Sequence, residues 1–220
     1  MNLLSIIGKR FKSAGLRDMA VESGVIAEGS IMNVLNGRSY NLGVRLSKVV
    51  YEALIRLAWR GFLPWFEEHH IDDMPLLSNT IDVVKRLDEN ITQQELEAAI
   101  QDPSCCNILE LFSEYLDHLR HGSGPLAAFW VSYLDMVEIL LALVRASREG
   151  HWLLHLAAVK SMLPWCFAHD KQNNARFLSV YYCQMSKLPE THPKVHQHMV
   201  DGGSSVQIGR SNPFGHIPVV

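Results

Sequence analysis

The stretch PLAAFWVSYLDMVEILLALVRASRE, residues 125–149, decides the fold class of this chain. Pro125 suits the first turn of a helix, where no backbone N–H is needed for an intrahelical bond, and Gly150 can end the same helix. The polar side chains of the stretch fall within one arc, and nearly all the others are apolar or aromatic. Such a helix is covered over most of its circumference, so we expect it to be central. The side chains expected to be buried are Trp130, Leu134, Val137, Leu141 and Val144.

The most apolar part of this stretch, Phe129–Val144, is too short for a comfortable membrane span. It also carries Asp135 and Glu138, and each acid at a bilayer centre would cost about 2.5–3.5 kcal/mol on insertion scales. We therefore expect a buried helix of a soluble domain and no membrane partner.

Helical signals continue on both sides of this segment. Thr92 followed by Glu95 forms a capping box, because each side chain can satisfy a free backbone N–H of the other. Ser30 is expected to cap a helix that Gly37 ends, and Pro64 is expected to kink or end a long helix that starts near Asn41. The expected helices cover residues 2–11, 16–23, 30–36, 41–63, 75–88, 93–100, 105–121, 125–149, 151–168, 173–185 and 191–200.

The sequence pattern changes after Gly203. The segment SSVQIG alternates and is rich in β-formers, RSNP is a turn signal, and FGHIPV can return as a second strand. The sequence therefore predicts a mainly α-helical fold, with a multi-helix domain over residues 1–203 and a short C-terminal β-hairpin or extended arm over 204–220. The acidic, proline-containing stretch at 67–75 is the predicted internal boundary of the helical domain.

Composition limits the class of protein. The chain has 220 residues, of which 48% are hydrophobic, enough for one sizeable core or two small ones. Its four cysteines form no CxxC pair, which argues against a zinc ribbon and a thioredoxin-like motif, and their spacing suggests no disulfide framework. A reducing, intracellular setting is the simplest interpretation.

The formal net charge of −3 conceals an uneven distribution. Residues 1–60 carry nine Lys and Arg against four Asp and Glu, residues 61–138 carry three against fifteen, and residues 139–220 carry eight against four. A basic N-terminal region could contact nucleic acid, which would allow a location in the nucleus. The alternative is that basic and acidic helices pack against each other. We favour this alternative, because aromatic residues do not interleave the basic ones as a stacking platform would need.

Four carboxylates are the candidate catalytic residues. Asp135, Glu138 and Glu149 share one arc of the central helix, and Asp170 could join them. Carboxylates that converge on a mostly buried helix can bind a divalent cation. The favoured alternative is a set of salt bridges or a solvated stripe, in which the acids pair with Arg145, Arg148 or Arg176. No other cofactor is expected, since the chain has neither a glycine-rich phosphate loop nor a GxSxG motif.

His151 and His155 stand four residues apart on an expected helix, a spacing that could place both imidazoles on one metal ion. In a zincin, glutamate would follow the first histidine, and here that residue is Trp152. We therefore expect capping or packing roles and no metal site. The three histidines within 191–198 are likewise expected on a solvated helix.

Nearly the whole chain resembles one protein family. The blocks that carry the resemblance are residues 3–30, 49–57, 129–196, 204–209 and 211–219, which include FWVSYLDMVEILLALVRASREGHWLLHLAAVKSMLPWCFAHD and SNPFGHIPV. The family consists of uncharacterised proteins that abound in the genomes of corals, other invertebrates and some fish, with distant relatives in fungi. Its members are multi-copy, look like products of mobile elements, and share a domain of unknown function.

The resemblance implies a mobile-element origin. Longer members continue past the Ile-Pro-Val block, where Asp usually follows, and Val220 stands at that place here. This implies a fragment of a larger reading frame or a decayed copy. Two function classes stay open: part of a transposase-like, nucleic-acid-processing protein, or a non-enzymatic helical protein-interaction module. Three carboxylates around one cavity would favour the first, and carboxylates paired with arginines would favour the second.

Overall fold

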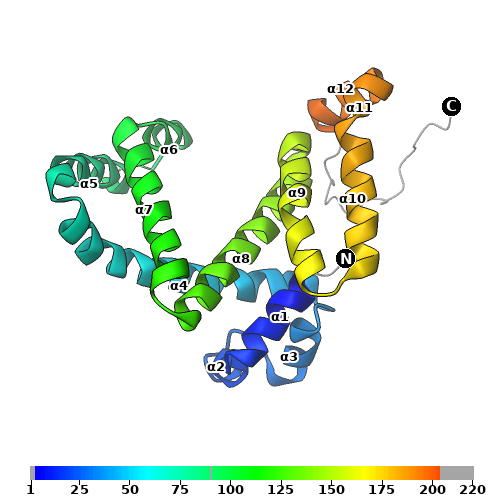
Figure 1. The fold of residues 1–220 in the computed structure, drawn as a ribbon, viewed down its shortest axis with the longest axis horizontal. Helices are drawn as coiled ribbons and strands as arrows, with labels where there is room; N and C mark the ends of the chain where they lie inside the picture. Colours follow the sequence, from blue (N-terminus) through cyan, green and yellow to red (C-terminus); the bar gives the residue numbers. More distant parts are fainter. Residues whose placement is uncertain (1–2, 90, 204–220) are drawn as a thin grey trace. The chain divides into compact units, whose positions relative to one another are not determined.

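The computed structural model of the protein describes residues 3–89 and 91–203, and within these ranges it is helical and contains no strand (Figure 1). The chain divides into two compact units. Unit 1 comprises residues 1–46 and 136–220, and unit 2 comprises residues 47–135. Residues 67–75, the predicted internal boundary, lie within unit 2, where α4 gives way to α5. The predicted β element at 204–220 lies outside the described residues.

The helices of unit 1 come from both ends of the chain. The N-terminal ones are α1 (Leu3–Ser13), α2 (Leu16–Glu22) and α3 (Glu28–Leu35). The C-terminal ones are the second half of α8 (Pro125–Glu149), α9 (Trp152–Ala168), α10 (Gln172–Ser186), α11 (Leu188–Thr191), α12 (Pro193–His198) and the short η2 (Met199–Gly203). Unit 2 holds most of α4 (Tyr40–His69), η1 (Ile71–Asp73), α5 (Met74–Glu89), α6 (Gln93–Ile100), α7 (Pro103–Gly122) and the first half of α8.

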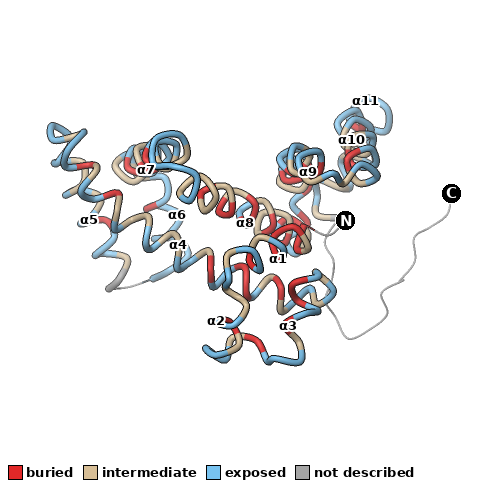
Figure 2. Tube along the Cα trace, turned by 60° about the horizontal axis from the view of Figure 1, so that its bottom comes forward, coloured by how far each residue is buried: buried red, intermediate tan, exposed pale blue. Residues whose placement is uncertain are grey.

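The central helix expected from the sequence is α8. It begins at Pro125 and ends before Gly150, whose positive φ of 68° suits glycine at a helix end. Figure 2 shows buried positions recurring along α8. Of the five side chains expected to be buried, Leu134, Val137 and Val144 are buried. Trp130 and Leu141 are less completely covered, and both are of intermediate exposure.

Helix α8 is also long and apolar enough to cross a membrane, by its length and composition. A mostly buried core helix of a soluble protein passes the same test, whereas 39% of the most apolar part of α8 is buried. Tyr133, Met136 and Val137 are fully enclosed, as expected of a helix that packs within a protein core.

Local sequence signals set most helix ends. At the start of α6, the Thr92 N–H donates to Glu95 Oε2 at 3.1 Å and the Glu95 N–H donates to Thr92 Oγ1 at 3.2 Å, which confirms the predicted capping box. Asp102 caps α7 by accepting the Ser104 N–H at 2.9 Å. Gly15 has a φ of 72° and separates α1 from α2, as predicted.

The predicted cap at Ser30 was wrong, and of the two alternatives predicted for Pro64, a kink or a helix end, the end does not occur. Ser30 does not cap α3, which starts at Glu28, so Ser30 lies inside the helix. Pro64 does not end α4, which continues to His69. Proline removes only its own N–H from the helical ladder, and the bonds around it persist, as in the His70 N–H to Phe66 carbonyl bond of 2.8 Å. The burial of Phe62 and Phe66 on either side holds this segment in place.

Unit 2 has an aromatic core between α4 and α7. It consists of Phe62, Phe66, Ile108, Phe112 and Tyr115. The half-buried Trp59 stacks on Phe112, with ring centroids 4.1 Å apart and planes 7° from parallel. The Tyr115 side chain reaches from α7 to Gly61 on α4, where a β-carbon would collide with the Tyr115 hydroxyl.

Unit 1 has an aliphatic core. Gly8 lets α1 approach α3, because a β-carbon at that position would collide with the backbone of Leu35. Phe11 and Ile31 are enclosed at this contact. At the other end of the chain, α9 and α10 pack against each other through residues that include the buried Ala158 and Ala175.

Candidate functional site

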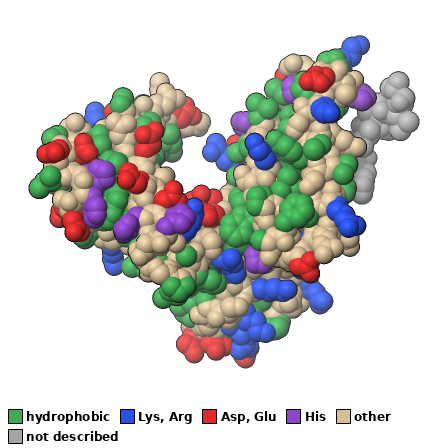
Figure 3. All heavy atoms as spheres, viewed as in Figure 1, with side chains coloured by type: hydrophobic (Ala, Val, Ile, Leu, Met, Phe, Trp, Pro, Cys, Tyr) green, Lys and Arg blue, Asp and Glu red, His purple; other side chains and the backbone are tan. Residues whose placement is uncertain are grey.

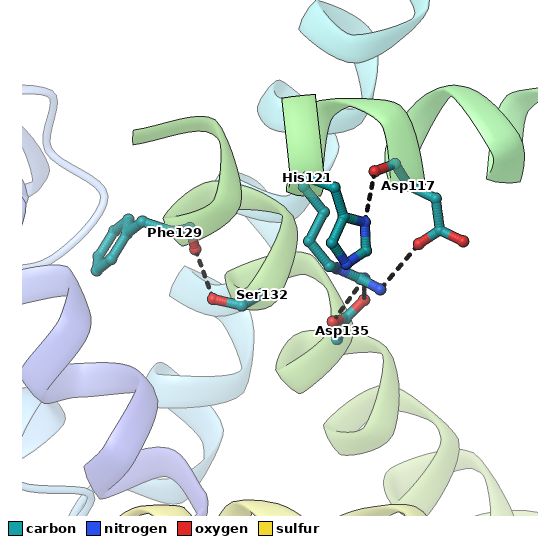
Figure 4. Close-up of polar contacts among 6 residues, drawn as sticks. Asp117, His121, Phe129, Ser132 and Asp135 are labelled. Carbon is teal, nitrogen blue, oxygen red and sulfur yellow. Dashed lines mark hydrogen bonds and ion pairs between the residues drawn. The ribbon is translucent and has the colours of Figure 1, made fainter. Parts of the chain in front are cut away.

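The first candidate acid, Asp135, belongs to an ion-pair network of unit 2. The Arg120 guanidinium donates to both carboxylate oxygens of Asp135, at 3.0 and 2.9 Å, and to Asp117 at 3.0 Å (Figure 4). The same view shows His121, whose Nδ1 lies 2.9 Å from the Asp117 carbonyl oxygen. Arg120 thus links the end of α7 to the first half of α8. The Asp135 carboxylate is paired with this arginine.

The other three candidates lie in unit 1, in separate surroundings. The single Nε–H of Arg145 is shared between the two carboxylate oxygens of Glu149, each 3.0 Å from Nε, so the predicted pairing with Arg145 is present. Asp170 follows α9 with a φ of 51° and accepts a hydrogen bond from Gln172 at 3.1 Å. Glu138 is exposed on the surface of α8.

Helix geometry explains why these acids do not converge. A rise of 1.5 Å per residue separates Glu138 from Glu149 by about 16 Å along the axis of α8. A shared arc on a helix therefore does not make a shared site. Within residues 3–89 and 91–203, no group of three His, Cys, Asp or Glu side chains is placed to hold a metal ion.

The two histidines of α9 have different roles. His151 is the N-cap residue, and its Nδ1 accepts the Leu154 N–H at 3.1 Å, as the capping hypothesis predicts. His155 Nε2 lies 3.1 Å from the hydroxyl of Tyr181 on α10, and its ring stacks on Trp152 with the planes 9° from parallel. Burial lowers the pKa of His155, so its imidazole is neutral near pH 7.

A basic surface forms where the two ends of the chain meet in unit 1. We use this name for Lys9, Arg10, Trp165, His169 and Lys171. The Arg10 guanidinium carbon lies 5.6 Å from the centroid of the Trp165 ring, within cation–π range. His169 stacks along the same ring, with centroids 6.3 Å apart and planes 17° from parallel.

Several positive charges lie near His169 on this surface. Burial is the main reason that the pKa of His169 is lowered, and the charges of Arg10, Lys9 and Lys171 lower it further. Three cations from α1 and from the turn after α9 therefore lie near one imidazole. Asp170, with its carboxylate bonded to Gln172, is the acid nearest in sequence.

The charge of the two units is opposite in sign. Unit 1 carries 14 Lys and Arg against 8 Asp and Glu, a formal net charge of +6, and unit 2 carries 6 against 15, a net charge of −9. On the face drawn in Figure 3, acidic side chains gather over the helices of unit 2 and Lys and Arg over those of unit 1. The basic surface thus belongs to a unit that is cationic as a whole.

The family model of a domain of unknown function (DUF8702) matches residues 1–214 of the chain. The chain belongs to this family. The match spans nearly the whole chain, in agreement with the extent of the resemblance found in the sequence. Neither a curated protein nor a solved structure matches the chain.

Only part of the basic surface of this DUF8702 protein could be predicted from the sequence. The basic N-terminal region was a signal, and Lys9 and Arg10 are part of it. The missing half was the aromatic partner, since Trp165 stands 155 positions after Arg10 and no local pattern links them. Along the sequence Phe11 stands between Arg10 and Lys12, but its ring is buried, and the aromatic ring that contacts Arg10 is that of Trp165.

Proposed function

We propose that the protein is a helical nucleic-acid-binding module of a mobile-element-derived protein, and that the basic surface of unit 1 contacts the phosphate backbone. The observation that carries the proposal is the convergence of Lys9, Arg10 and Lys171 beside Trp165 in a unit of net charge +6. Phosphate contacts supply most of the affinity in non-specific nucleic-acid binding. An aromatic side chain beside the cations adds a surface that a base can approach.

The proposal concerns binding rather than cutting. Metal-assisted phosphodiester cleavage needs carboxylates that converge on one reaction centre. Asp135 and Glu149 are each held by an arginine, and α8 keeps them far apart. A transposase-like chemistry in these described residues therefore has no support from the geometry. The mobile-element origin, and with it an intracellular and nuclear place of action, remain part of the proposal on the strength of the sequence resemblance.

The salt dependence of binding tests the proposal. We expect a fluorescein-labelled DNA duplex to bind the full chain. The logarithm of the association constant should fall linearly with the logarithm of the salt concentration between about 50 and 200 mM, and the slope of this line is the quantity to compare. The triple variant Lys9→Gln, Arg10→Gln, Lys171→Gln removes three cations. Because each phosphate contact contributes about 0.9 to the slope, the slope should decrease in magnitude by about 2 to 3. Fluorescence anisotropy measures both affinity and slope.

A matched control has the same change in net charge. Lys160, Lys187 and Lys194 are exposed lysines of unit 1 outside the basic surface. Their triple substitution by glutamine should change the slope by less than half as much. Equal effects of the two triple variants would show that only the net charge of unit 1 matters, and the absence of any binding at low salt would refute the proposal.

A protein partner is a second candidate, and it concerns unit 2. This acidic unit exposes several large hydrophobic side chains, and an acidic surface interspersed with such side chains suits a basic protein partner. The residues exposed by more than half are Leu57, Val84, Ile100, Ile71, Ile91 and Leu126. Variants of the basic surface would leave such an interaction unchanged, so the two candidates can be separated.

A further inference from the structure

A cavity of about 330 Å³ opens in unit 1 among α1, α4, α8, α9 and α10. Its floor is aliphatic and buried, and includes Leu4, Leu140, Val159 and Met162. Two aromatic side chains stand at its mouth, Tyr40 at 53% exposure and Phe177 at 69%. Ligand sites in proteins have volumes of about 300–1,000 Å³ and are mostly apolar, so this cavity is at the small end of that range.

One polar pair lies in the apolar wall. His155 and Tyr181 both line the cavity and are joined by the 3.1 Å contact between Nε2 and the hydroxyl. Trp152 stacks on the His155 ring at 5.6 Å, and Phe177 stacks on the Tyr181 ring at 6.3 Å. Aromatic contacts therefore fix both rings. A phenol has one donor and two acceptor sites, and the contact with His155 uses one of them, so the Tyr181 hydroxyl can bond a further group.

The lining is electrically neutral. No Lys, Arg, Asp or Glu is among the residues that line the cavity. Burial lowers the pKa of His155 and raises that of Tyr181, so both side chains are uncharged near pH 7. A carboxylate or phosphate in the cavity would lose its water shell with no cation beside it, which is costly. Charge complementarity thus excludes an anion, although unit 1 as a whole is cationic.

We propose that this cavity binds a small neutral molecule with a largely apolar body and one hydroxyl or carbonyl group, which hydrogen-bonds to Tyr181. The size of the cavity limits the apolar body to about that of a bicyclic ring or a short branched chain. The aromatic mouth covers the ligand, and the buried aliphatic floor supplies the hydrophobic contact. The site is separate from the basic surface, so it concerns a function beyond nucleic-acid binding.

Three related probes test this proposal on the full chain. Naphthalene, 2-naphthol and 2-naphthoate share one apolar body and differ in having no polar group, a neutral hydroxyl or a carboxylate. Isothermal titration at pH 7.5 should rank them with 2-naphthol first, naphthalene second and 2-naphthoate far behind. The substitution Tyr181→Phe removes only the hydroxyl. It should weaken 2-naphthol about 2- to 12-fold, which corresponds to one neutral hydrogen bond, and leave naphthalene unchanged.

Two further measurements locate the site. Leu143→Trp places a large ring into the cavity from a half-buried lining position, and should abolish binding of 2-naphthol and naphthalene alike. Val180→Ala, an exposed position of α10 outside the lining, should change neither. Should the tryptophan variant fail to fold, methyl NMR of the unaltered protein replaces it. The methyl signals of Leu140, Val159 and Met162 should shift with 2-naphthol, and those of unit 2 should not.

Each possible result either supports or overturns the proposed ligand site. Weaker binding of 2-naphthol to the Tyr181→Phe protein, together with shifts confined to the cavity, supports the proposal. Binding of 2-naphthoate as tight as that of 2-naphthol would overturn it, as would shifts elsewhere or no binding up to the solubility of the probes. None of these results depends on DNA binding by the basic surface.

Discussion

The two units of this protein differ in charge and in the chemistry of their cores. Unit 2 is acidic, with a net charge of −9, and its core is a cluster of aromatic rings between α4 and α7. Unit 1 has a net charge of +6, an aliphatic core, and its cavity and basic surface on helices from both ends of the chain. The continuous segment 47–135 thus forms the unit with the Arg120 ion-pair network, and the two segments of unit 1 together form the unit with the cavity and the basic surface.

The difference shows where features that suit ligands arise. In unit 2 the polar side chains satisfy each other over short sequence distances, as Arg120 does with Asp117 and Asp135. In unit 1 the pairs that matter join distant segments, Arg10 with Trp165 and His155 with Tyr181.

The largest expected effect is in the aromatic core of unit 2. Phe62→Ala removes a fully enclosed ring that contacts Trp59, Phe66 and Phe112, and should lower the free energy of unfolding by about 3–5 kcal/mol. Leu63→Ala, at the adjacent exposed position, should cost less than about 0.5 kcal/mol. Urea denaturation measures both.

Hydrogen exchange on the Phe62→Ala protein then compares the units. Amides of α7 should exchange faster than in the unaltered protein, and amides of α9 and α10 should keep their protection. Uniform loss of protection in all helices would mean that the two units unfold as one, and the comparison drawn above would not extend to stability.

The next effect is in unit 1, at the contact of α1 with α3. Gly8→Ala adds a β-carbon that collides with the backbone of Leu35, which cannot rotate away as a side chain would. We expect a loss of about 1–3 kcal/mol, as for other overpacked positions. Gly29→Ala is the matched control, because Gly29 lies inside α3 with open space around it and alanine is the better helix former by about 0.5–1 kcal/mol. Thermal melts that moved in the same direction for both variants would contradict the close approach.

These features differ in how far the sequence could predict them. The helices of unit 2 and the central helix α8 follow from local patterns: Pro125, Gly150 and the Thr92–Glu95 box each act within one or two turns. Pro64 does not end its helix, because Phe62 and Phe66 are buried on either side of it. The start of α3 at the exposed Glu28, two residues before Ser30, has no such explanation in burial.

The candidate site was harder to predict, for a physical reason. Asp135, Glu138 and Glu149 share an arc of α8, but the rise of the helix separates Glu149 from the other two, and Asp170 lies beyond α9. Arg120 comes from another helix to bind Asp135. The basic surface and the cavity depend on contacts across 155 and 26 residues, respectively, as the numbers of Arg10, Trp165, His155 and Tyr181 show. Nothing in a single sequence encodes such distances directly.

A smaller effect is expected at the start of α6 in unit 2. Thr92→Ala removes the hydroxyl that accepts the Glu95 N–H, and should cost about 1 kcal/mol. Thr92→Ser retains the hydroxyl and should restore most of the stability. Because the box is exposed and local, hydrogen exchange should report faster opening of α6 alone. A change in the protection of α9 would show that the effect is not confined to this helix.

The smallest effect concerns pH, and it should appear in unit 1. Burial lowers the folded-state pKa of His155 below its ordinary value of 6.5, and the pKa of His169 is lowered as well. A group whose folded-state pKa is lowered in this way binds its proton more readily in the unfolded chain. Stability should therefore be fully present above about pH 6.5 and decline as the pH falls below that value. One proton can contribute at most about 1.4 kcal/mol per pH unit, and the half-exposed rings should give only a fraction of that.

The double variant His155→Phe, His169→Phe should flatten the dependence of urea midpoint on pH between about 7 and 5. Val180→Ala, at an exposed position of α10, is the control and should leave the dependence unchanged. A slope that survives the double variant would move the pH-sensitive groups out of unit 1.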